Sequence, residues 1–134
     1  MQPSHRLGEL QHAIMRVLWQ MGEASVAEVQ KALEDGHPRA LTTIATMLVK
    51  MEKKGICTHR SVGRQFLYRA TVSEDEVTRS MVSELTTKLF AGDAIALVGH
   101  LLREEEFEVS DLARLKRLIS KREREEKEDA RGDE

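Results

Sequence analysis

The sequence contains little cysteine, few aromatic residues and no long apolar run. Its single cysteine, Cys57, excludes an internal disulfide and a metal site built from several cysteines. Aromatic residues make up only 4% of the 134 residues, so the core must be mostly aliphatic, which favours helices. No apolar run approaches the roughly 18 residues that cross a bilayer, and the start of the chain lacks the apolar centre of a signal peptide. We therefore expect a cytoplasmic protein without membrane insertion, built as one domain or as one small domain with an oligomerising appendage.

The motifs of catalysis are missing as well. The chain has five histidines, but it has no His-Glu-x-x-His, no glycine-rich phosphate loop, no nucleophile elbow and no histidine pair at ligand spacing. We expect no enzymatic activity, no cofactor and no metal. We expect Cys57 to be a small buried apolar residue rather than a redox sensor. His37 and His59 can lie near a nucleic acid, but ordinary surface or half-buried roles are the simpler expectation.

The net charge of −2 is an average over two unlike halves. Residues 1–72 carry ten Lys or Arg against six Asp or Glu, whereas residues 73–134 carry eleven against seventeen. This asymmetry indicates a basic module that meets an anion and an acidic module with another role, and chance patchiness is the simpler alternative.

Hydrophobic periodicity predicts a compact set of elements in the first half. Apolar residues three and four apart predict a helix over residues 7–21, and a second helix follows the capping box at residues 25–28. A third helix is predicted over residues 41–54. Beyond it the period changes to two, which predicts a β-hairpin with strands at residues 56–60 and 65–69. This order of elements is typical of a winged helix-turn-helix.

The second half, from residue 73 to about 120, is predicted to form three helices with apolar stripes. Such helices cannot bury their stripes well alone, so they either fold back on the first module or pair with a second chain, and we favour pairing. The fold class is therefore mainly α with a small β-hairpin: a winged helix-turn-helix over 1–72 and a helical dimerisation domain over 73–120. The charged segment 121–134 is either a helical extension or a disordered tail. The predicted dimer interface comprises Val77, Met81, Leu85, Leu89, Val98, Leu101, Leu115 and Ile119.

The third helix presents threonine and lysine opposite its apolar face. If this helix lies in the major groove of double-stranded DNA, the threonines contact bases and the lysines contact phosphates. A solvated helix face is the alternative, because any surface helix can show Thr and Lys to water. The predicted DNA-binding residues of this face are Thr42, Thr43, Thr46, Lys50 and Lys53.

The predicted hairpin adds arginines to the same half of the chain. Arg64 occupies its tip and Arg60 lies on its first strand, where a guanidinium can reach a phosphate or the minor groove. Arg69, on the second strand, is more simply explained as solvated. Taken together, the third helix and the hairpin favour DNA binding.

Three stretches of sequence carry a resemblance to a known family. The run Leu7 to Trp19, the run Leu41 to Gly55 with its T-x-x-T and K-K-G, and Gly63-Arg64-Gln65-Phe66-Leu67-Tyr68 together resemble the penicillinase repressor (BlaI/MecI) family. The resemblance covers about residues 7–120. It implies a dimeric repressor on a palindromic operator, with Thr43 and Thr46 at bases and Lys50 and Arg64 at phosphates.

The resemblance also implies a route of release. Repressors of this family are commonly cleaved after activation of a membrane-bound sensor metallopeptidase, and the dipeptide equivalent to the cleaved bond is His100-Leu101. The best-known members have Asn-Phe there, so the resemblance does not imply cleavage by the same specificity, and release by another signal from a membrane sensor stays open. Copper sensing by a cysteine-rich C-terminus is not expected in a chain with one cysteine. Two further functions stay open: a winged-helix adaptor that binds protein rather than DNA, and a repressor gated by a small ligand.

Overall fold

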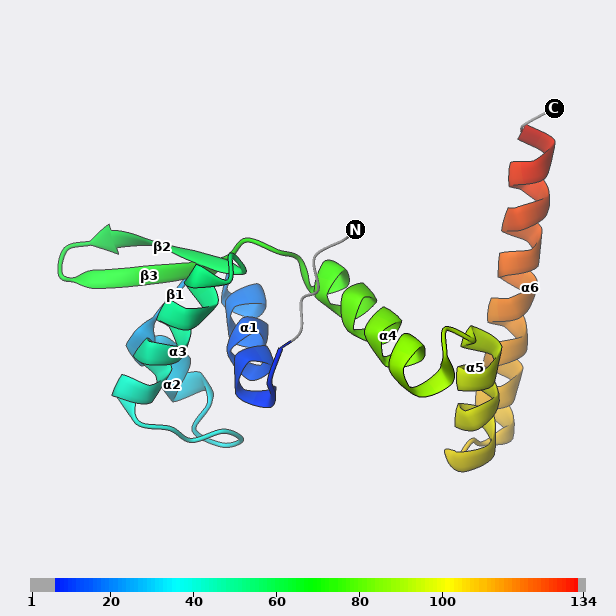
Figure 1. The fold of residues 1–134 in the computed structure, drawn as a ribbon, viewed down its shortest axis with the longest axis horizontal. Helices are drawn as coiled ribbons and strands as arrows, with labels where there is room; N and C mark the ends of the chain where they lie inside the picture. The colour runs from blue at the N-terminus through cyan, green and yellow to red at the C-terminus, as the bar shows by residue number, and fades with distance from the viewer. Residues whose placement is uncertain (1–6, 133–134) are drawn as a thin grey trace. The chain divides into compact units, whose positions relative to one another are not determined.

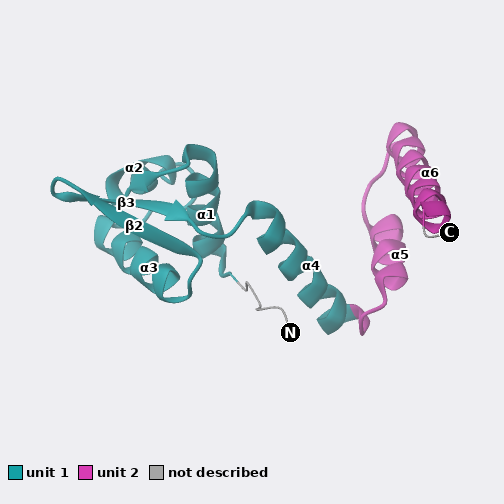
Figure 2. Ribbon diagram, turned by 90° about the horizontal axis from the view of Figure 1, so that it is seen from above, with its two compact units in different colours: residues 1–89 teal, residues 90–134 magenta. Residues whose placement is uncertain are grey.

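The computed structural model describes residues 7–132. The chain divides into two compact units, Met1–Leu89 and Phe90–Glu134 (Figure 2). Figure 1 labels the elements along the chain. They are α1 (Glu9–Met21), β1 (Ala24–Ser25), α2 (Val26–Ala32), α3 (Leu41–Lys53), β2 (Cys57–Val62), β3 (Gln65–Ala70), α4 (Glu74–Phe90), α5 (Ala94–Glu104) and α6 (Val109–Gly132).

The first unit has the predicted helices and their predicted start signals. Ser25 Oγ accepts a hydrogen bond from the Glu28 amide at 3.1 Å, and Glu28 Oε1 accepts one from the Ser25 amide at 3.0 Å. This reciprocal capping box satisfies two amides that have no partner inside α2 and fixes where the helix begins. Between α2 and α3 lies the turn around Gly36 and Pro38, so the two helices form the expected helix-turn-helix.

Three helices and the sheet enclose one aliphatic core. Side chains of α1 and α3 that are spaced three or four residues apart are buried, as the periodicity predicts, and α2 adds Val29. Trp19 lies at the edge of this core and donates from Nε1 to the Val72 carbonyl at 2.9 Å, which ties α1 to the segment after β3. The largest buried side chains are those of Ile14, Met15, Leu18, Val29, Ile44, Leu48, Met51, Cys57 and Val77.

The predicted hairpin is present as part of a three-stranded antiparallel sheet with the strand order β1-β3-β2. Strand β1 has only two residues, which pair as Ala24 with Tyr68 and Ser25 with Leu67. A two-residue strand is too short to show alternation, so the sequence pattern does not reveal it. Strands β2 and β3 pair along their whole length and form the wing, and both views show the closed end of this hairpin projecting beyond α1 to α3 (Figures 1 and 2).

The N-terminal part of α4 belongs to the first core. Val77 is 1% exposed and Met81 packs against the same buried cluster. We expected Val77 to contact a second chain, but its side chain is already covered by its own chain, because its turn of α4 packs against the core of the first unit. Val77 therefore leaves the proposed dimer interface.

The second unit is formed by α5 and α6. Asp93 caps α5 by accepting a hydrogen bond from the Ala96 amide at 3.1 Å. Helix α6 continues through Gly132, so residues 121–132 are helical rather than irregular. Neither α5 nor α6 has a buried residue within the single chain, although both carry apolar side chains.

Candidate nucleic-acid interface

Helix α3 separates an apolar face from a polar one. Ile44, Leu48 and Met51 are buried against the core. The opposite face is exposed along the length of the helix, because residues three or four positions apart lie on the same side of an α-helix. That exposed face contains all five residues predicted from the sequence to meet DNA: Thr42, Thr43, Thr46, Lys50 and Lys53.

The tip of the wing presents Arg64 to solvent. Val62 pairs with Gln65, so Gly63 and Arg64 form a two-residue turn. Gly63 has φ of 60°, a value that L side chains avoid and that the first position of a type II′ hairpin turn requires. This geometry closes the hairpin tightly and places the Arg64 side chain at its exposed end.

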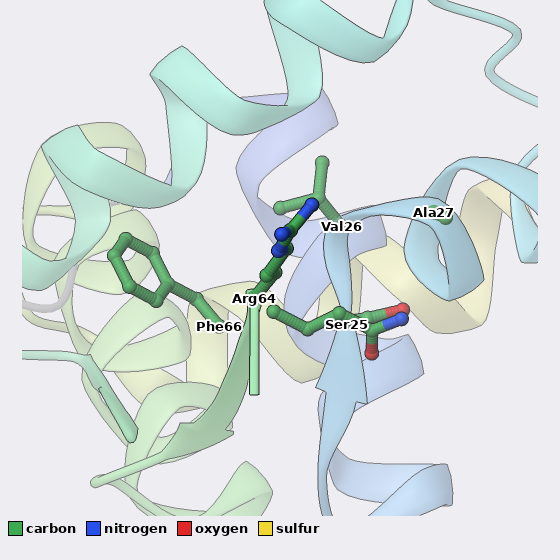
Figure 3. Close-up of a pocket in the computed structure, with 6 residues that line it drawn as sticks. Ser25, Val26, Ala27, Arg64 and Phe66 are labelled. Atoms are coloured by element: carbon green, nitrogen blue, oxygen red, sulfur yellow. The ribbon is translucent and has the colours of Figure 1, made fainter. Parts of the chain in front are cut away.

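A shallow cavity of about 290 Å³ lies between the wing and the start of α2. Figure 3 shows Arg64 and Phe66 from the wing beside Ser25, Val26 and Ala27. Ser25 Oγ and its amide are already engaged by Glu28 in the capping box. Residues of the wing and of the start of α2 therefore line the same cavity, and the hydroxyl and amide of Ser25 are already hydrogen-bonded there.

Arg60, which we also predicted to meet DNA, is engaged within the protein. It donates from Nε to Glu23 Oε2 and from Nη2 to Glu23 Oε1, both at 2.7 Å. The hydrogen bond from Arg60 lowers the pKa of the Glu23 carboxyl below its usual value, and the charges of Arg60 and Arg69 act in the same direction. A guanidinium held in this two-point geometry is directed at its own protein, unlike that of Arg64.

His59 faces the other side of the sheet. Its Nδ1 lies 2.6 Å from Glu52 Oε1 at the end of α3. Its ring also lies against Phe66 and Tyr68, with ring centroids 4.4 and 5.3 Å apart. Sequence reasoning missed both Glu23 and Glu52, because their partners come from other elements and no local spacing marks such pairs.

Cys57 is a buried residue, as expected. It is 2% exposed, and its Sγ donates to the Leu48 carbonyl at 3.7 Å. Burial, with a smaller contribution from the charge of Glu52, raises the pKa of its thiol to about 11. The thiol is therefore protonated near neutral pH and is a poor nucleophile there.

Of the other residues predicted for the dimer interface, Met81 is half-buried against the first core, and none of the rest is fully buried in its own unit. Leu85 and Leu89 are 44% and 67% exposed on α4. In the second unit, Val98 and Leu101 of α5 and Ile119 of α6 are exposed, whereas Leu115 is half-buried. An exposed apolar set of this kind is typical of a surface that a partner covers.

The candidate cleavage dipeptide, His100-Leu101, lies in the middle of α5. Both side chains are exposed, and the His100 ring lies 5.7 Å from that of Phe90 between centroids. Because proteases bind extended backbone, cleavage at this bond requires local opening of α5.

Over residues 7–132, no cluster of three or more His, Cys, Asp or Glu residues is arranged to hold a metal ion. No helix in that range is by itself both long and apolar enough to cross a membrane, although α4 and α5 taken together pass by length and composition.

An exposed polar helix in a helix-turn-helix, followed by a wing with a basic tip, defines a winged-helix DNA-binding protein. The sequence matches the family described as Penicillinase repressor over residues 7–121. The chain therefore belongs to the penicillinase repressor family, and it is a DNA-binding transcriptional repressor.

Individual relatives are distant in sequence. The penicillinase repressor of Bacillus licheniformis is 22% identical over 123 residues, which cover 92% of this chain and 96% of that protein. The solution structure of the monomeric form of Bacillus licheniformis BlaI with the blaP half-operator is 29% identical, with a TM-score of 0.48, and covers 57% of this chain and 93% of that chain. The C80S mutant of MarR from E. coli shares the fold at 15% identity, with a TM-score of 0.52 over 86% of this chain and 76% of that chain.

Proposed function

We propose that the protein represses transcription as a homodimer bound to a palindromic operator, with one winged helix on each half-site. The observation that carries this proposal is the exposed face of α3, which combines three threonines and two lysines in the same unit as Arg64 of the wing. Seated in a major groove, α3 directs threonine hydroxyls and methyls at base edges and lysines at phosphates.

The wing contributes a contact that does not depend on sequence. Arg64 at its tip is suited to a phosphate or to the minor groove beside the site that α3 occupies. In this account the threonines determine which bases are preferred, whereas Lys50, Lys53 and Arg64 determine how strongly any DNA is held.

The exposed apolar residues of the helical half support dimerisation. No residue of α5 or α6 is fully buried within one chain, and α4 leaves Leu85 and Leu89 exposed. A second copy covers such surfaces symmetrically, and a two-fold symmetric protein reads a two-fold symmetric DNA site. The proposed interface comprises Met81, Leu85, Leu89, Val98, Leu101, Leu115 and Ile119.

Binding to DNA across a salt series tests this function. Fluorescence anisotropy compares the duplex upstream of the protein's own gene with a scrambled duplex of the same length. We expect a preference of about a thousand-fold or more, two chains per site and a steep salt slope. Equal and weak binding to both, together with no duplex enriched from a random pool, would reject a specific repressor and favour the protein-binding adaptor.

For release, we propose cleavage at His100-Leu101 by a protease that a membrane sensor controls, or by the sensor metallopeptidase itself. Cutting α5 separates α6 from the winged helix and so removes part of the apolar surface that holds two copies together. Mass spectrometry of the protein from induced cells tests this step. A fragment ending at His100 is the expected product, and intact protein after full derepression contradicts it.

A further inference from the structure

Two consecutive side chains of β2, His59 and Arg60, are each bound by a carboxylate from another element. Arg60 is held by Glu23, which lies in the turn after α1, through two hydrogen bonds of 2.7 Å. His59 is held by Glu52, in the last turn of α3, at 2.6 Å. Consecutive residues of a strand point to opposite faces of the sheet, so the two carboxylates reach β2 from its two sides.

These two contacts lie where the sheet changes from three strands to two. Ser25 and Arg60 both pair with Leu67, one from each side of β3. Beyond this row β1 has ended, and residues 61–66 pair only within the hairpin. A two-stranded ribbon is only marginally stable alone, so its direction depends on how its base is held.

The two contacts join the wing to the elements that carry the rest of the interface. Glu52 belongs to α3, whose exposed face we propose to enter the major groove. Glu23 precedes β1 and the start of α2, which face Arg64 and Phe66 across the cavity of Figure 3. The two carboxylates therefore tie β2, the strand that leads to Arg64, to α3 and to the segment before α2.

We propose that Glu23 and Glu52 are positioning residues for DNA binding: they hold the base of the wing so that Arg64 reaches DNA at the same time as α3. Arg60 acts through Glu23 and contacts no phosphate. This inference rests on the proposed function. It assigns a favourable role to two negative charges that, by electrostatics alone, oppose binding to a polyanion.

The direction in which the DNA affinity changes distinguishes a positioning role from a purely electrostatic one. Glu23→Gln and Glu52→Gln each remove a negative charge, yet we expect each to weaken binding by about three- to five-fold, a size typical of losing one partly exposed polar contact. Glu34→Gln is the matched control, because Glu34 is exposed in the turn before α3, away from the wing contacts. We expect the control to bind as tightly as the unaltered protein or up to about two-fold tighter.

Arg60 provides a second, independent readout. Arg60→Gln should weaken binding by the same factor as Glu23→Gln and leave the salt slope unchanged, whereas Arg64→Gln should lower the slope by about one per chain. The double variant Glu23→Gln/Arg60→Gln should lose no more than either single variant, because both remove the same contact.

The experiment uses the full chain and a duplex enriched from a random-sequence pool by the unaltered protein, with anisotropy measured across a salt series. Hydrogen exchange without DNA is followed in parallel over residues 58–67. Faster exchange there in the Glu23 and Glu52 variants, but not in Glu34→Gln, is expected. Circular dichroism melting checks that each variant is folded.

Several results would overturn the inference. Tighter binding by Glu23→Gln with a steeper salt slope would show that the pair masks a phosphate-binding Arg60. Unchanged affinity and unchanged exchange in both variants would show that neither carboxylate positions the wing. If the unaltered protein enriches no duplex, the proposed repressor function is rejected independently of the wing contacts. In that case, unchanged exchange over residues 58–67 in the variants would show that Glu23 and Glu52 do not hold the wing.

Discussion

Helices α1 and α5 both carry apolar residues on one face, yet they differ in what they bury. Helix α1 buries Ile14, Met15, Val17 and Leu18 within its own chain, whereas α5 buries no residue. The same contrast holds between the two units, because all the fully buried residues between 7 and 132 lie at or before Val77. An amphipathic sequence thus specifies that a helix has a partner, but the partner can belong to the same chain or to another.

In the dimer that we propose, this contrast gives the two units different roles. The first has a complete core and presents a polar, basic surface, which suits a module that binds an anion as a rigid body. The second presents apolar surface, which suits association. In a dimeric repressor the two roles depend on each other, because binding two half-sites at once raises the effective affinity of each winged helix.

The largest expected effect is on the core of the first unit. Leu48→Ala removes a fully buried side chain and should lower the free energy of unfolding by about 2–5 kcal/mol. Val49→Ala, at the adjacent and 46% exposed position, should change it by less than about 0.5 kcal/mol. Urea unfolding followed by Trp19 fluorescence measures both variants. Equal decreases in the free energy of unfolding of the two variants would contradict the comparison, because they would show that the first unit has no specific core.

The next effect concerns the second unit and its association. Ile119→Asp places a charge on the exposed apolar face of α6 and should raise the dimer dissociation constant by about 100-fold. Ser120→Asp introduces the same charge at the neighbouring exposed position and should leave association nearly unchanged. Sedimentation equilibrium compares the two variants. An unchanged dimer in Ile119→Asp would remove α6 from the interface.

A smaller expected effect concerns how the stability of the first unit depends on pH. The pKa of buried Cys57 is raised from 9.0 to about 11, so the unfolded chain loses this proton at lower pH than the folded protein does. The resulting stabilisation is complete below pH 9 and is lost as the pH rises towards 11, with a loss of about 1.4 kcal/mol at pH 10. Cys57→Ala should remove this part of the pH dependence between urea unfolding at pH 8 and at pH 10. The same pH dependence with and without the thiol would contradict its burial in the first core.

The smallest expected effects concern DNA contacts on the surface of the first unit. Arg64→Ala should weaken binding by about five-fold on every sequence and reduce the salt slope by about one per chain. Gln65→Ala, next to it on the wing, is the neutral control. Thr46→Ala should instead change which bases are preferred, and this is measured by repeating the selection from random DNA. An unaltered preference would argue against base contact by Thr46.

Much of the first unit could be predicted from the sequence because its signals are local. The capping box at Ser25, the three helical periods and the turn at Gly63 each act within a few residues, and the structure has them where the pattern indicates. The exposed face of α3 follows from the same periodicity. Local signals of this kind fix both an element and its orientation.

Contacts between distant elements were not predictable in the same way. Strand β1 is too short for a pattern, and the pairing of Arg60 with Glu23 joins residues 37 positions apart. Val77 shows why the helical half was harder still: its spacing of four with Met81 fits a dimer seam as well as a core. Only the packing of the start of α4 against the core of the first unit decides that Val77 faces its own chain.

Hydrogen exchange measured at decreasing protein concentration tests the central claim most directly. If the first unit is complete in one chain and the second is completed by another copy, dilution should leave the protection of α1 to α3 unchanged while the protection of α5 and α6 falls as the dimer dissociates. Protection of α5 and α6 that persists in the dilute monomer would contradict the account, as would a loss of protection in both units together.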